Sequence, residues 1–90
     1  MKDKDEAVAH YQRGQAFYEK KQFSEAINEF TRAIEFSPDN PVGYSARGAV
    51  YRQKGDIEAA ISDLEKAFHI DQSDAFTFNQ LQMARKSAAK

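Results

Sequence analysis

The sequence predicts an all-α protein, and three observations lead to this prediction. Apolar side chains recur at the spacing of a helix face in successive stretches of the 90-residue chain. Residues that cap or stop helices separate these stretches. The pattern of the first stretches returns farther along the chain, which is typical of a protein built from repeated helical units.

The repeat has a period of 34 residues. Shifting the sequence by this length pairs the following identical residues: Val8 with Val42, Arg13 with Arg47, Gly14 with Gly48, Lys20 with Lys54, Ala26 with Ala60, Ile27 with Ile61, and Ala33 with Ala67. The matches concentrate at small and apolar positions, where packing between helices limits the choice of residue. We therefore interpret the chain as two copies of a unit that contains two helices.

Five helices are expected, near residues 5–20, 23–36, 40–54, 57–70 and 74–87. In the first unit, residues at helical spacing predict two helices. They are Tyr11, Gly14, Phe17 and Tyr18 for the first helix, and Phe23, Ala26, Ile27, Phe30, Ala33 and Ile34 for the second. The second helix is expected to stop at Ser37-Pro38, because the residue before a proline is disfavoured in the helical conformation.

The breaks in the second half carry equally specific signals. Asn40 is a suitable N-cap for the third helix, and Pro41 fits its first turn because that N–H has no helical partner. Gly55 suits the left-handed residue that ends a helix, and Asp56 can cap the fourth. On the fifth helix we expect Phe78 and Leu81 to pack inward, which leaves an outer stripe formed by Phe76, Gln80 and Met83.

Glycines in the middle of helices indicate close packing. Gly14 and Gly48 each cost about 1 kcal/mol relative to alanine, so their presence at one point of both units suggests that two backbones approach there. We expect their neighbours to be Ala26 and Ala60. The remaining matched alanines, Ala33 and Ala67, are expected where one hairpin stacks on the next.

These features resemble the tetratricopeptide repeat, whose pattern is Trp-x2-Leu-Gly-x2-Tyr, then Ala-x3-Phe, then Pro. The first copy here is His10-x2-Arg13-Gly14-x2-Phe17, Ala26-x3-Phe30 and Pro38, and the second is Tyr44-x2-Arg47-Gly48-x2-Tyr51 and Ala60-x3-Leu64. The resemblance implies a right-handed α-solenoid of two antiparallel helical hairpins plus a closing helix. It also implies one domain over residues 1–90, with repeats near 7–40 and 41–74 and a capping helix near 75–88.

Several positions depart from the family pattern. Lys21 replaces a turn glycine, and Gln72 replaces the second proline. Two arginines, Arg13 and Arg47, replace leucine, and each has an acidic residue at the same distance along the chain: Glu29 for Arg13 and Asp63 for Arg47. We hypothesise that each pair bridges the helices of its own hairpin. The alternative is that both arginines lie along the surface with their charged ends in water.

Composition excludes several classes of function. Thirteen Lys and Arg residues face fourteen Asp and Glu residues, so the net charge is −1, and we expect no nucleic-acid binding. The chain contains no cysteine and no apolar run long enough to cross a membrane, so we expect no membrane partner and a cytoplasmic location. His10 and His69 fall on different helices, and His10 occupies a packing position. No catalytic, metal-binding or cofactor-binding set is therefore expected, and the protein is predicted not to be an enzyme.

The resemblance implies a protein or peptide partner, bound by an adaptor or scaffold module in a concave groove. The groove residues carried over from the family are Val8, Tyr11, Gln15, Tyr18, Val42, Ser45, Ala49, Arg52, Phe76, Asn79 and Met83. A subgroup of the family grips acidic chaperone tails with a cationic carboxylate clamp. The corresponding positions here are Tyr11, Gln15, Ala46, Phe76 and Gln80. None is positively charged, so we expect no dicarboxylate clamp.

A second interpretation stays open. Helical repeat arrays usually need three or more repeats for stability, and this chain has two. The outer stripe of the closing helix, with Phe76 and Met83, could then be the contact of a homodimer. The chain could also be a fragment of a larger repeat protein.

Overall fold

The computed structural model describes residues 2–89, which form five α-helices and no strand. The helices are α1 (Lys2–Glu19), α2 (Phe23–Phe36), α3 (Pro41–Lys54), α4 (Ile57–Ile70) and α5 (Ala75–Ala88). Their bounds agree with the predicted ranges to within about one residue, except that α1 begins at Lys2 instead of near residue 5. The predicted all-α class is confirmed.

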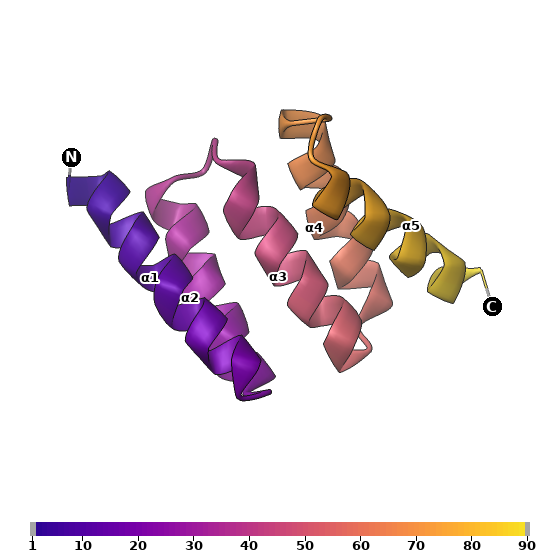
Figure 1. Cartoon of the computed structure of the whole chain (residues 1–90), viewed down its shortest axis with the longest axis horizontal. Coiled ribbons are helices and arrows are strands. Elements are labelled where there is room, and N and C mark those ends of the chain that lie inside the picture. Colours follow the sequence, from indigo (N-terminus) through magenta and orange to yellow (C-terminus); the bar gives the residue numbers. More distant parts are fainter. Residues whose placement is uncertain (1, 90) are drawn as a thin grey trace.

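The helices form two packed layers (Figure 1). Each hairpin pairs adjacent helices, α1 with α2 and α3 with α4, and α5 packs mainly against α4. In the view of Figure 1, α1, α3 and α5 lie nearer the viewer, with α2 and α4 behind them. The described part of the chain is an elongated slab of 43 × 28 × 17 Å, and its front layer carries the first helix of each unit.

The turn of the second hairpin follows the predicted chemistry. The backbone of Gly55 is left-handed (φ 97°), and its N–H donates to carbonyl groups in the last turn of α3. Asp56 then caps α4 by accepting a hydrogen bond from the backbone N–H of Ala59. At the start of α3, the Asn40 side chain accepts from the Val42 N–H, with Pro41 in the first turn. All three predicted boundary signals are confirmed.

The turn of the first hairpin uses less favourable residues. Lys21, the counterpart of Gly55, is left-handed (φ 61°) although it carries a Cβ atom, and such a conformation costs an L-residue about 1 kcal/mol. Gln22, the counterpart of Asp56, makes no capping hydrogen bond through its side chain. The first turn therefore has the same shape without the stabilising residues of the second.

Two apolar clusters form the core. The first joins Ala26 and Phe30 of α2 to Val50 of α3, so it links the two hairpins. The second contains Ala60, Leu64, Leu81 and Ala84, which join α4 to α5. Phe30 and Leu64 occupy equivalent positions and are almost completely buried.

The mid-helix glycines make room for these large side chains. A Cβ added to Gly14 would lie 2.6 Å from Cε1 of Phe30, and one added to Gly48 would lie 2.8 Å from Cγ of Leu64. The predicted close approach of two backbones, with Ala60 as the neighbour, is confirmed at Gly48, where the Ala60 carbonyl oxygen would lie 3.2 Å from the added Cβ. At Gly14 the three nearest atoms all belong to the ring of Phe30, which fills the space left by the missing side chain.

A third close contact joins the hairpins. A Cβ added to Gly43 would lie 2.8 Å from Cγ1 of Ile34, so α3 crosses α2 with almost no space between them. Nothing in the 34-residue pattern identified Gly43, because the position one repeat earlier is Ala9.

The predicted bridge between Arg47 and Asp63 is confirmed. Nε and Nη2 of Arg47 donate to the two carboxylate oxygens of Asp63 at 2.6 and 2.7 Å, and both side chains are largely buried. The hydrogen bond to Asp63 raises the pKa of Arg47 above its usual value. Nη1 of Arg47 also donates to Oγ1 of Thr31 on α2, at 3.0 Å. One guanidinium on α3 therefore contacts both α4 and α2.

The equivalent pair in the first hairpin is much looser. Nη1 of Arg13 lies 3.6 Å from Oε1 of Glu29, and the Arg13 side chain is 55% exposed. Nδ1 of His10 donates to the same oxygen at 2.7 Å, and the imidazole stacks on the ring of Phe36. The bridge predicted at Arg13 is thus a weak ion pair, because His10 occupies the carboxylate. His10 is half-buried, as predicted.

The closing helix packs differently from the prediction. Leu81 is buried, but Phe78 is 46% exposed, and its ring lies tilted beside that of Phe68 with 6.2 Å between the ring centres. Thr77 and Ala84 complete the buried face, because positions 77, 81 and 84 follow the helical period more closely than 78 does. Among residues 2–89, no helix is both long and apolar enough to cross a membrane.

Candidate functional site

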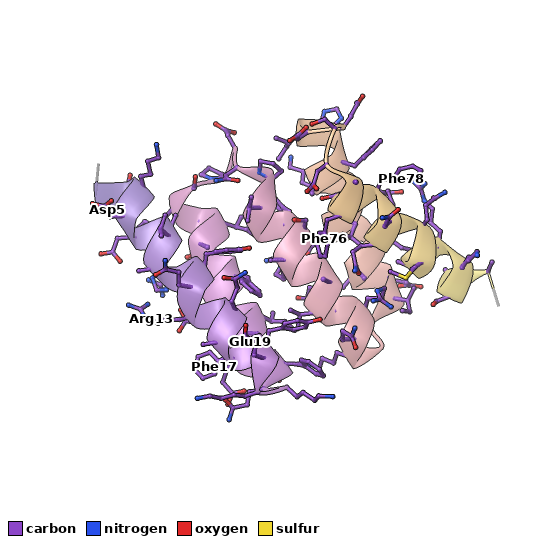
Figure 2. The ribbon with its side chains drawn as sticks, viewed as in Figure 1. Asp5, Arg13, Phe17, Glu19, Phe76 and Phe78 are labelled. Atoms are coloured by element: carbon purple, nitrogen blue, oxygen red, sulfur yellow. The ribbon has the colours of Figure 1, made fainter. Side chains whose placement is uncertain are left out.

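The front layer contains a cleft of about 280 Å³ between α1, α3 and α5. Its lining residues are Tyr11, Gln15, Tyr18, Phe30, Val42, Ser45, Ala46, Ala49, Val50, Asp74, Phe76 and Gln80. Figure 2 shows Phe76 on this front face, whereas Arg13 and Phe17 project from the opposite edge of α1. The cleft therefore belongs to the inner surface of the first helix of each unit.

The floor of the cleft is apolar and fixed. Phe30 and Val50 are almost completely buried there, and Ala49 is 7% exposed. The walls are aromatic: Tyr11 leans on Phe30, with 5.6 Å between the ring centres, and Phe76 stands opposite on α5 with 49% of its surface exposed. Small residues on α3 leave this space open, so an apolar side chain of a ligand could enter between the rings.

Polar groups at the rim can orient a ligand. Nε2 of Gln15 donates to the Tyr11 hydroxyl at 3.0 Å. Burial raises the pKa of Tyr11 above its usual value, so its hydroxyl stays protonated at neutral pH and can donate to a ligand carbonyl. On the other side, Oε1 of Gln80 accepts from Nε of Arg52 at 2.8 Å, which links α5 to α3.

The charge of the cleft is negative. Asp74 is the only charged residue among those that line it. Its Oδ1 accepts from the backbone N–H of Phe76 at 3.1 Å, and its Oδ2 accepts from the Thr77 hydroxyl at 2.8 Å. The carboxylate caps α5 and at the same time forms part of the cleft wall.

Most of the residues predicted for the groove lie together. Those that line the cleft are Tyr11, Gln15, Tyr18, Val42, Ser45, Ala49 and Phe76. Arg52 reaches the rim through Gln80. Val8 lies beside the cleft in a smaller pocket of about 150 Å³, which shares Tyr11 and Val42 with it.

Two predicted groove residues lie elsewhere, and others were missed. Asn79 and Met83 are exposed on α5 and are not among the residues that line the cleft, although Met83 lies two helical turns after Phe76 on the same face. Phe30, Val50 and Asp74 were not predicted. Phe30 was expected only to pack between helices, and Val50 was given no role; both line the cleft while almost completely buried. The signal for Asp74 was its position one repeat after Asn40, the predicted N-cap.

Within residues 2–89, no three His, Asp or Glu side chains are arranged to hold a metal ion. The same residues leave no buried side-chain nitrogen or oxygen atom without a hydrogen-bond partner. The cleft combines an apolar floor, hydroxyl and amide groups at the rim, and one carboxylate.

Comparison with known proteins places this geometry in a family. A model described as TPR repeat matches residues 14–53, and a model described as tetratricopeptide repeat matches residues 43–74. The mouse protein DnaJ homolog subfamily C member 7 is 34% identical over 70 residues, which are 78% of this chain and 14% of that protein. The chain thus spans about one seventh of the length of this curated relative.

Solved structures agree closely with the fold. The Sgt2 TPR domain from Aspergillus fumigatus superimposes with a TM-score of 0.90 and 32% identity, over 93% of this chain and 56% of that one. The second TPR of Spaghetti (RPAP3), bound to the HSP90 peptide SRMEEVD, gives a TM-score of 0.94 and 25% identity, over 98% and 82% of the two chains.

Proposed function

Because the chain belongs to the tetratricopeptide repeat family, we propose that it is a protein-interaction module that docks a short segment of a partner protein in the cleft between α1, α3 and α5. The cleft itself is the observation that carries this proposal. It combines a rigid apolar floor, aromatic walls and a polar rim, the combination that peptide-binding sites use for affinity and orientation.

The preferred segment differs from the acidic peptide SRMEEVD held by the Spaghetti (RPAP3) relative. The positions that correspond to a dicarboxylate clamp hold Tyr11, Gln15, Ala46, Phe76 and Gln80, all uncharged. Asp74 adds a negative charge to the same wall. An acidic tail would lose its hydration here without gaining a cationic partner. We expect no binding of SRMEEVD to this chain by fluorescence polarisation, and micromolar affinity would contradict the proposal.

The role as an adaptor needs no catalysis. We propose a module without enzymatic, metal-dependent or cofactor-dependent activity, located in the cytoplasm and independent of nucleic acid and membrane. The net charge of −1 supports the last point, because nucleic acids and anionic lipids attract basic surfaces.

The chain offers a matched pair of variants for the test. Phe76 and Phe78 lie on the same helix and are 49% and 46% exposed, but only Phe76 lines the cleft. The wild type, Phe76→Ala and Phe78→Ala would each be used to enrich partners from the lysate of the native host. A protein retained by the wild type and Phe78→Ala, and lost with Phe76→Ala, would support docking in the cleft. Equal recovery with all three would contradict it.

Self-association is the second candidate function, and the surface of α5 favours it. Two large apolar side chains on one face of this helix, Phe76 and Met83, are 49% and 41% exposed. A homodimer that pairs this face of α5 with its copy would cover them. Sedimentation equilibrium over a concentration series tests this, with Met83→Glu as the control because Met83 does not line the cleft. A monomer at every concentration would exclude it.

A further inference from the structure

We infer that the segment bound in the cleft carries a lysine or arginine that pairs with Asp74, next to an apolar residue that contacts Phe76. This inference rests on the proposed function and specifies the chemistry of the partner. It starts from a charge that the fold does not require.

Asp74 and Asn40 occupy the same position of successive repeats and cap their helices in the same way. Oδ1 of Asn40 accepts from the N–H of Val42 at 3.0 Å, and Oδ1 of Asp74 accepts from the N–H of Phe76 at 3.1 Å. Asparagine and aspartate are about equally good N-caps. The capping hydrogen bond is therefore available to either residue, and the aspartate adds a negative charge that the N-terminus of α5 stabilises and that lies at the cleft.

The carboxylate has capacity for a further partner. An ionised carboxylate offers about four acceptor positions, and the structure uses two, for the Phe76 N–H and the Thr77 hydroxyl. In the described part of the chain, no Lys, Arg or His nitrogen lies within 4.0 Å of Asp74, whereas Asp63 and Glu29 both have such neighbours. Asp74 therefore presents an unneutralised acceptor at the cleft wall.

The basic side chain at the rim of the cleft, Arg52, binds another residue. Arg52 donates its Nε to Gln80 and does not line the cleft. A ligand cation beside Asp74 would form a charge-assisted hydrogen bond at the edge of an apolar floor, where such bonds are stronger than in open solvent. Because Phe76 follows Asp74 by two residues on the first turn of α5, the basic and apolar side chains of the ligand would be neighbours.

A random peptide display library provides the probe. Selections would be run in parallel against the wild type, Asp74→Asn and Phe76→Ala. Asp74→Asn keeps the cap, and the Thr77 hydroxyl can rotate to accept from the new amide, so this variant removes charge alone. Circular dichroism melting would verify that all three proteins are folded.

The expected result has two parts. Peptides selected by the wild type are enriched in Lys or Arg at a fixed spacing from an apolar residue, and they bind Asp74→Asn about three- to tenfold more weakly. The same peptides with the basic residue replaced by glutamine bind the wild type and Asp74→Asn equally. Added salt weakens binding to the wild type more than binding to Asp74→Asn.

The outcomes separate the two proposals. Two outcomes would overturn the pairing with Asp74 and leave the peptide-binding cleft intact. In both, the selected peptides lose binding with Phe76→Ala. In the first they are not enriched in Lys or Arg, and in the second they bind Asp74→Asn as tightly as the wild type. If no selected peptide depends on Phe76, the proposed function and the inference both fail.

Discussion

The two hairpins have the same backbone plan but are held together by different side chains. In the second, Asp63 receives two short hydrogen bonds from Arg47 inside a largely buried contact. In the first, the equivalent Glu29 is shared between His10 and a mostly exposed Arg13. The turns differ in the same direction, because Gly55 adopts its left-handed conformation without strain and Lys21 does not.

This difference shows that two repeats can share the same backbone shape while different side-chain contacts stabilise each of them. Each level of local chemistry in the second hairpin agrees with the fold: the turn residue, the N-cap and the interhelical pair. The first hairpin departs at each of these points and depends more on its aromatic contacts, such as Tyr11 with Phe30 and Tyr18 with Phe23. We expect local opening under native conditions to be more frequent in the first hairpin than in the second.

The largest expected effect is at the interhelical pairs. Asp63→Ala leaves the half-buried Arg47 guanidinium without its carboxylate and is expected to lower the free energy of unfolding by about 3 kcal/mol. Glu29→Ala removes a more exposed contact and should cost about 1 kcal/mol or less. Urea denaturation followed by circular dichroism measures both. Equal losses of unfolding free energy in the two variants would contradict the proposed difference between the hairpins.

The next effect concerns the glycines. Gly48→Ala would place its Cβ 2.8 Å from Cγ of Leu64 and 3.2 Å from the Ala60 carbonyl oxygen, which belongs to the backbone and cannot rotate away. We expect a net cost of about 1–3 kcal/mol, despite the higher helix propensity of alanine. At Gly14 the added Cβ would lie 2.6 to 2.9 Å from three atoms of the buried Phe30 ring, so Gly14→Ala should cost at least as much. Thermal melts measure both losses, and a wild-type melting temperature for either variant would contradict the prediction.

A smaller and opposite effect is expected at the turns. Lys21→Gly should stabilise the protein by about 1 kcal/mol, because it removes the strain of a left-handed residue with a Cβ atom. Gly55→Lys introduces the same strain and should destabilise it by a similar amount. A double variant that exchanges the two residues should return to nearly the wild-type melting temperature. An unchanged melting temperature for Lys21→Gly alone would show that the first turn is not strained.

The smallest expected effect is a pH dependence of stability that comes from Asp71, the residue that follows α4. Hydrogen bonds from the Ser73 side chain and backbone lower the pKa of Asp71 below its usual value, whereas its counterpart after α2 is Ser37, which does not titrate. A lowered folded-state pKa means that Asp71 contributes stability above its unfolded pKa, and that this contribution is lost as the pH falls through the folded value. Asp71→Asn should flatten the acidic part of the stability profile slightly. An identical profile would contradict the assignment.

The sequence predicted the fold well because helical periodicity and boundary residues act locally. Asn40, Gly55 and Asp56 each determine their own turn, and the spacing of Arg47 and Asp63 places them on facing helices. It was harder to predict which of several neighbouring side chains on one helix face makes a given contact. The carboxylate of Glu29 binds His10 as well as Arg13, and the inward stripe of α5 passes through Thr77 instead of Phe78.

The candidate site shows the same limit. The family positions include seven residues that line the cleft, and they also include Asn79 and Met83, which do not line it although Met83 shares a helical face with Phe76. Asp74 was missed because a helix cap is identified by its backbone role. Whether the same side chain also reaches a cleft depends on how α5 lies against α3, which no local pattern specifies.

The contact of Arg47 with Thr31 has a consequence for how the chain unfolds. In repeat arrays, the coupling between neighbouring units decides whether they melt separately or together. The guanidinium that holds the second hairpin closed also contacts α2, and Val50 of α3 belongs to the same core cluster as Phe30. Fraying of the first hairpin would therefore expose groups on which the second depends. This short array is expected to melt as one cooperative unit, with the weaker hairpin setting the temperature at which both are lost.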